Sequence, residues 1–416
     1  MLRFASSPTG DMHIGDLRIA ILNYLVAQQK NESFIVRIED RDKEKMIEGK
    51  DTEIMQILEK FALPHASVFH QSEHLRMHQT LAIQLLKEKK AFICLCSEEA
   101  HTDAYSGRCI DASHDVDALK KEKIPFVIRM KQPTAPIAYD DMIQGERVAT
   151  PQEVDDFVIL GEDGIPSYNF ACACDDMLSG VNFIICQENH LLDTPRQKHI
   201  KAQLGYEEET RYAHLPAILH TESESSVIWL FEQGFIPNAI INYLLILGNM
   251  ETPQEIFTLP EAIEWFSLEA LCPSSVTFDL ERLRSINKEH LKRMDDKALS
   301  SLFGFADADV GKLVKLYLEE VSTINELALK IRPIFAPKVL EGEEKEKMQI
   351  LQKLIENAPM IATFDAFKLS LIQQSGLEEQ ALLQPLRILL TGSEYGPELS
   401  LIYPLIKPYL LEVISS

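Results

Sequence analysis

Hydrophobic and polar positions along the first 90 residues predict strands and helices in alternation. Apolar runs at 2–6 and 33–39 predict buried strands. Apolar positions at helical spacing predict helices over 16–29, 51–61 and 74–89. Strands that alternate with helices build parallel sheets, since each helix carries the chain back to the starting edge. The N-terminal part is therefore predicted to be an α/β domain.

The pattern changes twice further along the chain. Residues 89–162 are richer in proline, cysteine and short β-like runs, which predicts an inserted α+β domain. Strands and helices return over 163–216, so the sheet domain is expected to consist of 1–88 and 163–216. Helical spacing dominates from there to the end, and we divide this part into domains at 217–292 and 293–416.

Composition restricts where the protein works. No run of about 18 apolar residues occurs, so no membrane span is expected. The chain enters a strand at residue 2, which leaves no room for a signal peptide. Seven cysteines, odd in number and sparsely placed, favour a reducing compartment over a disulfide framework. We expect a cytoplasmic protein that acts as a monomer.

The formal net charge of −23 argues against nucleic acid as a partner, because phosphate contacts need lysine and arginine. The charge of a whole chain does not fix the charge of one face, however. Basic clusters occur at Lys120, Lys121 and Lys123, and at Arg282, Arg284, Lys288, Lys292 and Arg293. Two interpretations stay open for them, solvated helix faces and contacts with phosphates.

The most informative segment is the N-terminal turn. Residues 2–16 read Leu-Arg-Phe-Ala-Ser-Ser-Pro-Thr-Gly-Asp-Met-His-Ile-Gly-Asp, a short strand, a proline–glycine turn and a helix start. Free backbone N–H groups and the positive end of the helix dipole favour the binding of phosphate at such a turn. His13 can donate to a phosphoryl oxygen in a transition state, so His13 and the backbone at Gly15 are the candidate catalytic groups. The alternative is a capping turn with a surface histidine. The spacing is that of neither a Walker loop nor G-x-G-x-x-G, which excludes ordinary kinases and dehydrogenases.

This turn resembles the first signature of class I aminoacyl-tRNA synthetases, in the glutamyl-tRNA synthetase form A-P-S-P-T-G-x-x-H-x-G. The similarity extends over essentially the whole chain. Further landmarks follow in family order: Ser33–Asp40, Gln71–Glu73, Phe126–Arg129, Tyr168–Ala171, Asp175–Asp176, Thr194–Pro195, His214–Pro216, Gly234–Pro237, Asn242–Leu244, Leu247–Gly248, Phe278–Asp279 and Leu390–Gly392.

The resemblance implies the fold and the reaction. It implies a Rossmann-like catalytic sheet, an insertion that holds the tRNA acceptor end, a stem-contact domain and a helical anticodon-binding tail. It implies that glutamate and ATP, with Mg²⁺, form glutamyl-adenylate, and that the tRNA 3′ ribose then takes the glutamyl group. Such phosphoryl chemistry depends on positioning and charge neutralisation.

The resemblance also assigns residues by position. Arg3 would pair the side-chain carboxylate of glutamate, for which its forked donors are suited, and Glu39 would hold the amino group. The remaining glutamate-pocket positions are Ala5, Ser7, Tyr168, Cys172 and Cys186. The positions that would contact ATP are Thr9, Gly10, His13, Gly15, Asp16, His214 and Leu215. Cys172 and Cys174, which we expect on an apolar strand, are also interpreted as core residues.

Three positions depart from the family pattern. The family's I-R-G-E-D-H reads Ile185-Cys-Gln-Glu-Asn-His190, so Cys186 replaces the arginine that meets the substrate α-carboxylate. One lost charged hydrogen bond costs about 1.5–3 kcal/mol, a tenfold to hundredfold loss of binding. Arg41, in place of a threonine, shares a strand face with Glu39, so it either replaces that arginine or faces solvent. The third departure is Asp16, whose carboxylate would stabilise the start of the helix but would repel a triphosphate.

The family's lysine-bearing lid, K-[ML]-S-K-[RS], has no counterpart before Gly234. The chain runs Leu219-His-Thr-Glu-Ser-Glu-Ser-Ser-Val227, and no lysine occurs between Lys201 and Lys288. Either the lid is deleted, or residues between Glu224 and Ser225 are missing from the sequence. A genuine deletion would remove the lysine that stabilises the ATP phosphates in the family.

The cysteines of the insertion form a candidate metal site. Cys94-x-Cys96 lies on a strand-like run, so both thiols face one side, and Tyr105 and Cys109 follow. Some relatives bind zinc with Cys-x-Cys and a downstream pair, and a tetrahedral site needs four ligands. The resemblance therefore offers Cys94, Cys96, Tyr105 and Cys109 as zinc ligands. The alternative is a set of reduced cysteines in a β-rich insertion.

Three functional hypotheses follow. The first is a glutamate–tRNA ligase that uses ATP and Mg²⁺. The second is a divergent copy that charges glutamine-accepting tRNA with glutamate. The third is a non-catalytic tRNA-binding paralogue, suggested by Cys186, Asp16 and the missing lid.

Overall fold

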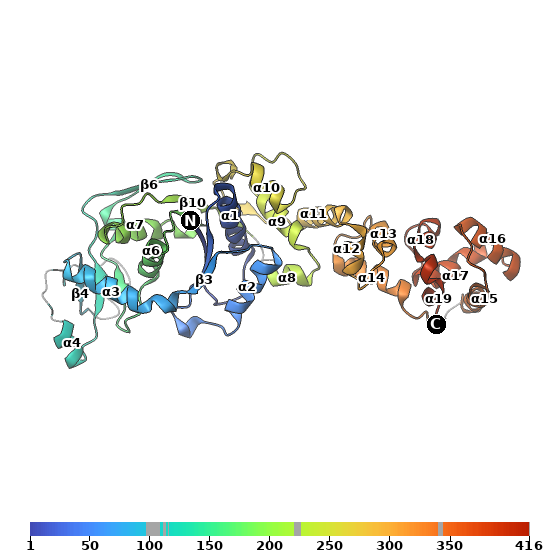
Figure 1. The fold of residues 1–416 in the computed structure, drawn as a ribbon, viewed down its shortest axis with the longest axis horizontal. Helices are drawn as coiled ribbons and strands as arrows, with labels where there is room; N and C mark the ends of the chain where they lie inside the picture. The colour runs from blue at the N-terminus through green and yellow to red at the C-terminus, as the bar shows by residue number, and fades with distance from the viewer. Residues whose placement is uncertain (97–108, 111–113, 115, 220–225, 340–343, 416) are drawn as a thin grey trace. The chain divides into compact units, whose positions relative to one another are not determined.

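The computed structural model describes residues 1–96, 109–110, 114, 116–219, 226–339 and 344–415 (Figure 1). The chain divides into two compact units. The first consists of Met1–Trp229 and Leu244–Phe278, and the second of Leu230–Tyr243 and Asp279–Ser416. Among the described residues, no helix has the length and apolar character needed to cross a membrane.

A seven-stranded sheet forms the centre of the first unit. Its order is β3-β2-β1-β9-β10-β6-β7, and all neighbours are parallel except β6 and β7. The strands are β1 (Leu2–Ser6), β2 (Phe34–Ile38), β3 (Ser67–His70), β6 (Ile137–Asp141), β7 (Gly145–Ala149), β9 (Phe183–Gln187) and β10 (Arg211–Leu215). The predicted parallel sheet is confirmed, because β1 and β2 pair in register from Leu2 with Phe34 to Ser6 with Ile38.

Helices pack against this sheet (Figure 1). The helices of this unit include α1 (Ile14–Lys30), which packs directly on β1 and β9, α2 (Lys50–Lys60), α3 (Leu75–Lys87), α6 (Tyr168–Leu178), α7 (Asp193–Gln203) and α10 (Leu259–Trp265), which packs on α1. Cys172 and Cys174 lie on helix α6, so their predicted strand is wrong, although both side chains are buried as expected. A short apolar run does not by itself distinguish a buried strand from a buried helix.

The inserted segment contributes to two sheets. β4 (Ala91–Cys94), β5 (Val127–Met130) and β8 (Val158–Leu160) form a separate antiparallel sheet. The hairpin β6–β7 instead joins the large sheet, where Asp141 pairs with Tyr212. The segment also contains helices α4 (Val116–Glu122) and α5 (Pro151–Val154). The described part of the first unit also contains a short pair of strands, β11 (Ile218–Leu219) and β12 (Val276–Thr277).

The second unit is helical, as the spacing after residue 217 predicts. Its helices are α11 (Leu280–Arg293), α12 (Asp296–Ser301), α13 (Ala308–Tyr317), α14 (Ile324–Phe335), α15 (Lys345–Glu356), α16 (Phe364–Ser375), α17 (Glu379–Thr391), α18 (Leu399–Ile406) and α19 (Leu410–Val413). Helices α8 (Val227–Glu232) and α9 (Pro237–Ile246) contain residues of both units. Capping residues define several starts; Thr323, for example, forms a capping box with Glu326.

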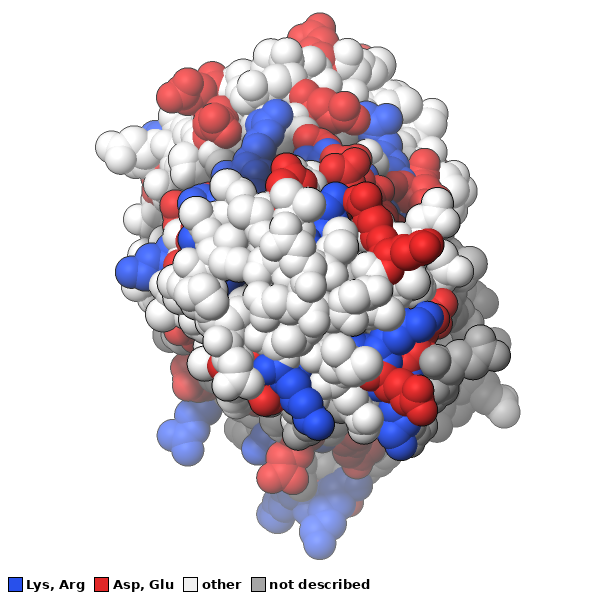
Figure 2. Space-filling model, turned by 90° about the vertical axis from the view of Figure 1, so that its right-hand side faces the viewer, with Lys and Arg blue, Asp and Glu red and all other residues white. Residues whose placement is uncertain are grey.

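Apolar side chains remain exposed on the second unit. Met360 is 75% exposed, Leu369 55% and Leu401 52%. Figure 2 faces the end of the chain near α16 and shows uncharged side chains gathered at the centre, with charged ones around them.

Candidate functional site

The carboxyl ends of β1, β9 and β10 lie side by side, where parallel α/β sheets bind ligands. After β1 the chain turns through residues 7–13 and enters α1. His13 is the N-cap residue of this helix, with an exposed side chain that makes no capping hydrogen bond. The backbone N–H groups of the first turn of α1 are therefore available for an anion.

A cavity of about 290 Å³ opens at this edge and brings most of the predicted glutamate-pocket residues together. Its lining includes Arg3, Ala5, Ser7, Glu39, Tyr168 and Cys186, and also Thr9 and Asp16. Cys172 is not among the lining residues. Its thiol lies within hydrogen-bonding distance of Glu39, 3.3 Å from Oε1, so Cys172 contacts a lining residue rather than the cavity itself.

Two buried arginines share one buried carboxylate at this cavity. Arg3 donates from Nε and Nη2 to Asp176, at 3.2 and 3.3 Å. Arg37 donates from Nη1 to Asp176 at 2.5 Å, and from Nη2 to Glu39 at 3.2 Å. Burial opposes ionisation of Asp176, but Arg3 and Arg37 outweigh it and hold its pKa well below the usual range. The group is therefore fully ionised near neutral pH.

Sequence analysis missed Arg37, which lines the cavity beside Arg3. A signal was present, because Arg37 lies two residues before Glu39 in an otherwise apolar strand. A charged side chain in a strand that is buried along its whole length needs a partner, and side chains two apart share a face.

A second cavity of about 330 Å³ adjoins the first. His13, Gly15 and Leu215 line it, and Asp16, Ile19 and Gln187 line both cavities. Gly10 and His214 are not among the lining residues of either cavity, and Thr9 lines only the first. The two cavities therefore share a wall, and together they form a charged half at Arg3 and Glu39 and a half at the start of α1.

Asp16 lies where the two cavities meet. Its Oδ1 accepts a hydrogen bond from Gln187 Nε2 at 2.8 Å, and burial raises its pKa above the usual range. The same glutamine approaches Gly15 closely, since a Cβ there would lie 3.3 Å from Gln187 Nε2. Gly15 thus allows the side chain of Gln187 to reach the carboxylate of Asp16.

His214 is buried beside the site rather than exposed in it. Its Nδ1 lies 2.6 Å from Asp141 Oδ2, and its Nε2 lies 2.9 Å from Thr194 Oγ1. Burial would lower the pKa of His214, but the Asp141 hydrogen bond and the nearby Cys186 outweigh it and raise the pKa to about 9. His214 therefore anchors β10 to β6 next to Leu215.

This pair predicts a pH-dependent stability. The folded-state pKa of His214 is raised from 6.5 to about 9, so its stabilisation is complete below pH 6.5 and is lost as pH rises through 9. His214→Gln should lower the free energy of unfolding by up to about 3 kcal/mol at pH 6, and by much less at pH 10. Urea unfolding at both pH values measures this difference. An equal loss at both would show that the histidine is neutral in the folded state.

Arg41 fits neither of its two sequence-based interpretations. Its Nη1 donates to the carbonyl of Pro166 at 3.2 Å, and its guanidinium stacks 5.5 Å from the ring centroid of Tyr168. It is not among the residues that line the first cavity. Arg41 therefore supports the wall residue Tyr168 from outside the pocket.

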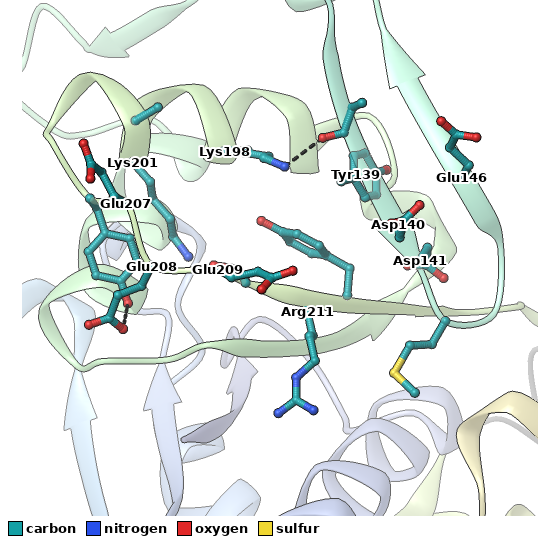
Figure 3. Close-up of a pocket in the computed structure, with 16 residues that line it drawn as sticks. Tyr139, Asp140, Asp141, Glu146, Lys198, Lys201, Glu207, Glu208, Glu209 and Arg211 are labelled. Carbon is teal, nitrogen blue, oxygen red and sulfur yellow. Dashed lines mark hydrogen bonds between the residues drawn. The ribbon is translucent and has the colours of Figure 1, made fainter.

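A third cavity, larger than these two at about 610 Å³, lies elsewhere in the first unit (Figure 3). Acidic side chains outnumber basic ones in its lining, namely Asp140, Asp141, Glu146, Glu207, Glu208 and Glu209 against Lys198, Lys201 and Arg211. This charge balance disfavours a triphosphate, so cavity size does not identify the nucleotide site.

Three of the four predicted zinc ligands come together in the insertion. The sulfur atoms of Cys94, Cys96 and Cys109 all lie within 4.8 Å of one another, with 3.6 Å between Cys96 and Cys109. Burial and the neighbouring sulfurs raise the pKa of Cys96 to about 11. Tyr105, the fourth predicted ligand, and the lid position between Glu224 and Ser225 lie outside the described residues.

Comparison with known proteins assigns relatives to the whole chain. The family described as "tRNA synthetases class I (E and Q), catalytic domain" matches residues 1–285, and an anticodon binding domain matches 270–408. Glutamate--tRNA ligase 2 of a Sulfurovum species is 58% identical over 429 residues, and glutamate--tRNA ligase 1 of a Nitratiruptor species is 47% identical over 434; both matches cover 100% of each chain. A crystal structure of a glutamate tRNA ligase from Elizabethkingia meningosepticum, in complex with its amino acid, matches with a TM-score of 0.80 and 25% identity. That match covers 99% of this chain and 97% of that one.

Proposed function

Because the chain belongs to the class I tRNA synthetases of the glutamate and glutamine type, we propose that it attaches glutamate to tRNA through glutamyl-adenylate. The observation that carries the proposal is the pair of adjoining cavities at the start of α1. One has Arg3 for a carboxylate and Glu39 for an ammonium group, and the other has the helix N-terminus and His13 that a phosphate needs. The protein would act in the cytoplasm, where its tRNA and ATP are.

In this proposal the first cavity holds glutamate. The guanidinium of Arg3, already fixed by Asp176, pairs the side-chain carboxylate. Glu39 is oriented by Arg37 and Ser7 and accepts hydrogen bonds from the substrate ammonium. Tyr168 forms a wall and is held in place by Arg41 and by His190, whose Nδ1 lies 3.3 Å from its hydroxyl. Each recognition group is thus positioned by a second residue before substrate arrives.

The second cavity holds ATP, so that the α-phosphate meets the glutamate α-carboxylate near Asp16. A carboxylate oxygen attacks the α-phosphorus and pyrophosphate leaves. His13 and the N–H groups of the first turn of α1 donate to the phosphoryl oxygens as charge develops on them. The 3′-terminal ribose hydroxyl of tRNA then attacks the glutamyl carbonyl, and AMP leaves.

Mg²⁺ fits the second cavity. Mg²⁺ is bound by one or two carboxylates together with substrate phosphates, and Asp16 is the carboxylate among the described lining residues. When bound, the ion neutralises phosphate charge. Asp16 would then attract the magnesium complex of ATP instead of repelling a bare triphosphate, which gives a role to this departure from the family pattern.

Zinc fits the three thiols of the insertion. With Zn–S bonds of about 2.3 Å, sulfur atoms of a tetrahedral site lie about 3.8 Å apart, close to the 3.6 Å between Cys96 and Cys109. Cys94, Cys96 and Cys109 would hold the ion as thiolates. The ion would then fix Cys109 to the end of β4.

The tRNA partner needs phosphate contacts despite the acidic chain. The basic side chains of α11 are largely paired within the second unit. Arg284 bonds Glu326 at 2.6 Å, and Lys288 and Lys292 both pair with Glu319. We infer that phosphates compete with these acids for the lysines, so that binding falls steeply as salt rises.

The proposal is tested by charging two tRNA transcripts separately with labelled glutamate, one glutamate-accepting and one glutamine-accepting. We expect the purified chain to attach glutamate to the first in an ATP-dependent reaction. Attachment only to the second would identify the divergent copy that misacylates glutamine-accepting tRNA. Binding of both transcripts without attachment to either would contradict the proposed function.

A further inference from the structure

A group of polar side chains outside both cavities converges on one oxygen atom. His74 ends the short 3₁₀ helix η2 (Gln71–His74), His78 lies four residues later on α3, and Asp175 lies on α6. Nε2 of His78 is 2.7 Å and Nδ1 of His74 is 2.9 Å from Oδ1 of Asp175. One nitrogen from each histidine and one aspartate oxygen all lie within 4.8 Å of one another.

The other oxygen of the carboxylate is held separately. Gln71 donates from Nε2 to Asp175 Oδ2 at 2.8 Å, which leaves Oδ1 to the two imidazoles. The ring of His74 stacks on Phe69 with the centroids 4.8 Å apart. Supporting contacts of this kind orient ligands around a metal ion, since they fix which atom of each side chain points inward.

Hydrogen bonds within the cluster do not satisfy all of its polar atoms. Nδ1 of His78 and Oε1 of Gln71 are buried without a hydrogen-bond partner. Neither atom faces the carboxylate, because His78 approaches Asp175 with its other ring nitrogen and Gln71 with its amide nitrogen. His78 and Asp175 are fully buried, whereas the side chain of His74 is 34% exposed. The cluster is thus closed on the protein side and open to solvent at His74.

We propose that His74, His78 and Asp175 form a binding site for a divalent transition-metal ion, with Zn²⁺ as the best-fitting ion. Two histidines four residues apart, joined by a carboxylate, are a recurrent zinc ligand set. Mg²⁺ and Ca²⁺ prefer all-oxygen sites, so the two imidazoles select against them. Water completes the coordination from the open side at His74.

The charges around the cluster are compatible with a cation. The carboxylate of Asp175 contacts the imidazole of His78 and also interacts with the charge of Arg37. Arg37 itself is offset by Asp176 and Glu39. A bound ion would tie η2 and α3 to α6 and so stabilise the folded chain, since an ion that binds only the folded state raises its stability by mass action.

The test uses the full chain with Cys96→Ser and Cys109→Ser, which removes the thiol cluster as a competing site. After chelation and dialysis, Zn²⁺ binding is measured by equilibrium dialysis, and Co²⁺ is added as an absorbing probe. We expect one Zn²⁺ per chain, a raised melting temperature, and Co²⁺ absorption without the strong near-ultraviolet bands of thiolate ligation. No bound Zn²⁺ in this variant would overturn the proposal and leave the cluster as a hydrogen-bonded contact between α3 and α6.

His74→Ala in the same background tests the ligand assignment, because its side chain is partly exposed and its loss spares the core. Zn²⁺ affinity should fall by at least about tenfold, since even a residue that only supports a ligand contributes that much. His70→Ala is the matched control. Its side chain is 37% exposed and its Nδ1 lies 3.2 Å from Asp40, outside the cluster, so Zn²⁺ affinity should be unchanged. Equal affinities in the His74 variant and its parent would overturn the site, as would equal losses in both histidine variants.

Discussion

His13→Ala should slow glutamyl-adenylate formation by about 10²–10³-fold while ATP affinity changes little, because one donor aimed at developing charge is worth that much. The histidine is exposed at the start of α1 and makes no capping hydrogen bond. Because the side chain is exposed, we expect its removal to spare the fold. The loss of rate then falls on the transition state rather than on the bound ground state.

Rapid-quench measurement of adenylate formation, with tRNA present, separates the two effects. ATP affinity is taken from the dependence of the rate on ATP concentration. His70→Ala is a suitable control, because His70 lies outside both cavities. Equal losses in rate and in ATP affinity would show that His13 only shapes the turn.

Arg3→Ala should remove most of the preference for glutamate over glutamine. Without the guanidinium, the negatively charged side chain of glutamate loses far more binding free energy than the neutral amide of glutamine does. One charged hydrogen bond alone is worth about tenfold to hundredfold in kcat/KM. The variant should also be less stable by about 3–5 kcal/mol, because the fully buried Asp176 loses one of its two arginine partners.

Arg3→Lys separates recognition from stability. The ammonium keeps a positive charge beside Asp176 but cannot form the two-pronged contact that guanidinium makes with a carboxylate. We expect this variant to unfold near the parent's denaturant midpoint and still to lose glutamate specificity, measured as the ratio of kcat/KM for glutamate and glutamine. An unchanged ratio would place the recognition of the side-chain carboxylate elsewhere, with Arg37 the next residue to test.

Local patterns predicted the parts of the site that are continuous in sequence. The strand, turn and helix over 2–30 form as their spacing indicates, and the family assignment made on that turn is confirmed. Two elements of the first unit illustrate where such patterns fail. β3 (Ser67–His70) was missed because it is short and half-exposed, with no apolar run. The strand expected around Cys172 is a helix, because the apolar run from Phe170 to Cys174 fits either period.

Contacts between distant segments could not be predicted in the same way. Arg3 and Arg37 are separated from Asp176 by more than a hundred residues, and only the assembled sheet and α6 show that they share its carboxylate. The same holds for His214, which was expected to contact ATP together with Leu215. Asp141 of β6 holds its imidazole in the interior, and of the two residues Leu215 alone lines the second cavity. Charge partners of this kind depend on tertiary packing, which residue spacing does not contain.

The central claim is that the two adjoining cavities hold the two halves of glutamyl-adenylate. A crystal structure with a non-hydrolysable glutamyl-adenylate analogue tests it most directly. The account predicts the glutamyl side chain at Arg3, the phosphate mimic beside His13 and the first turn of α1, and the adenosine toward Leu215. An analogue bound in the 610 Å³ cavity, or with its glutamyl end away from Arg3 and Glu39, would contradict it.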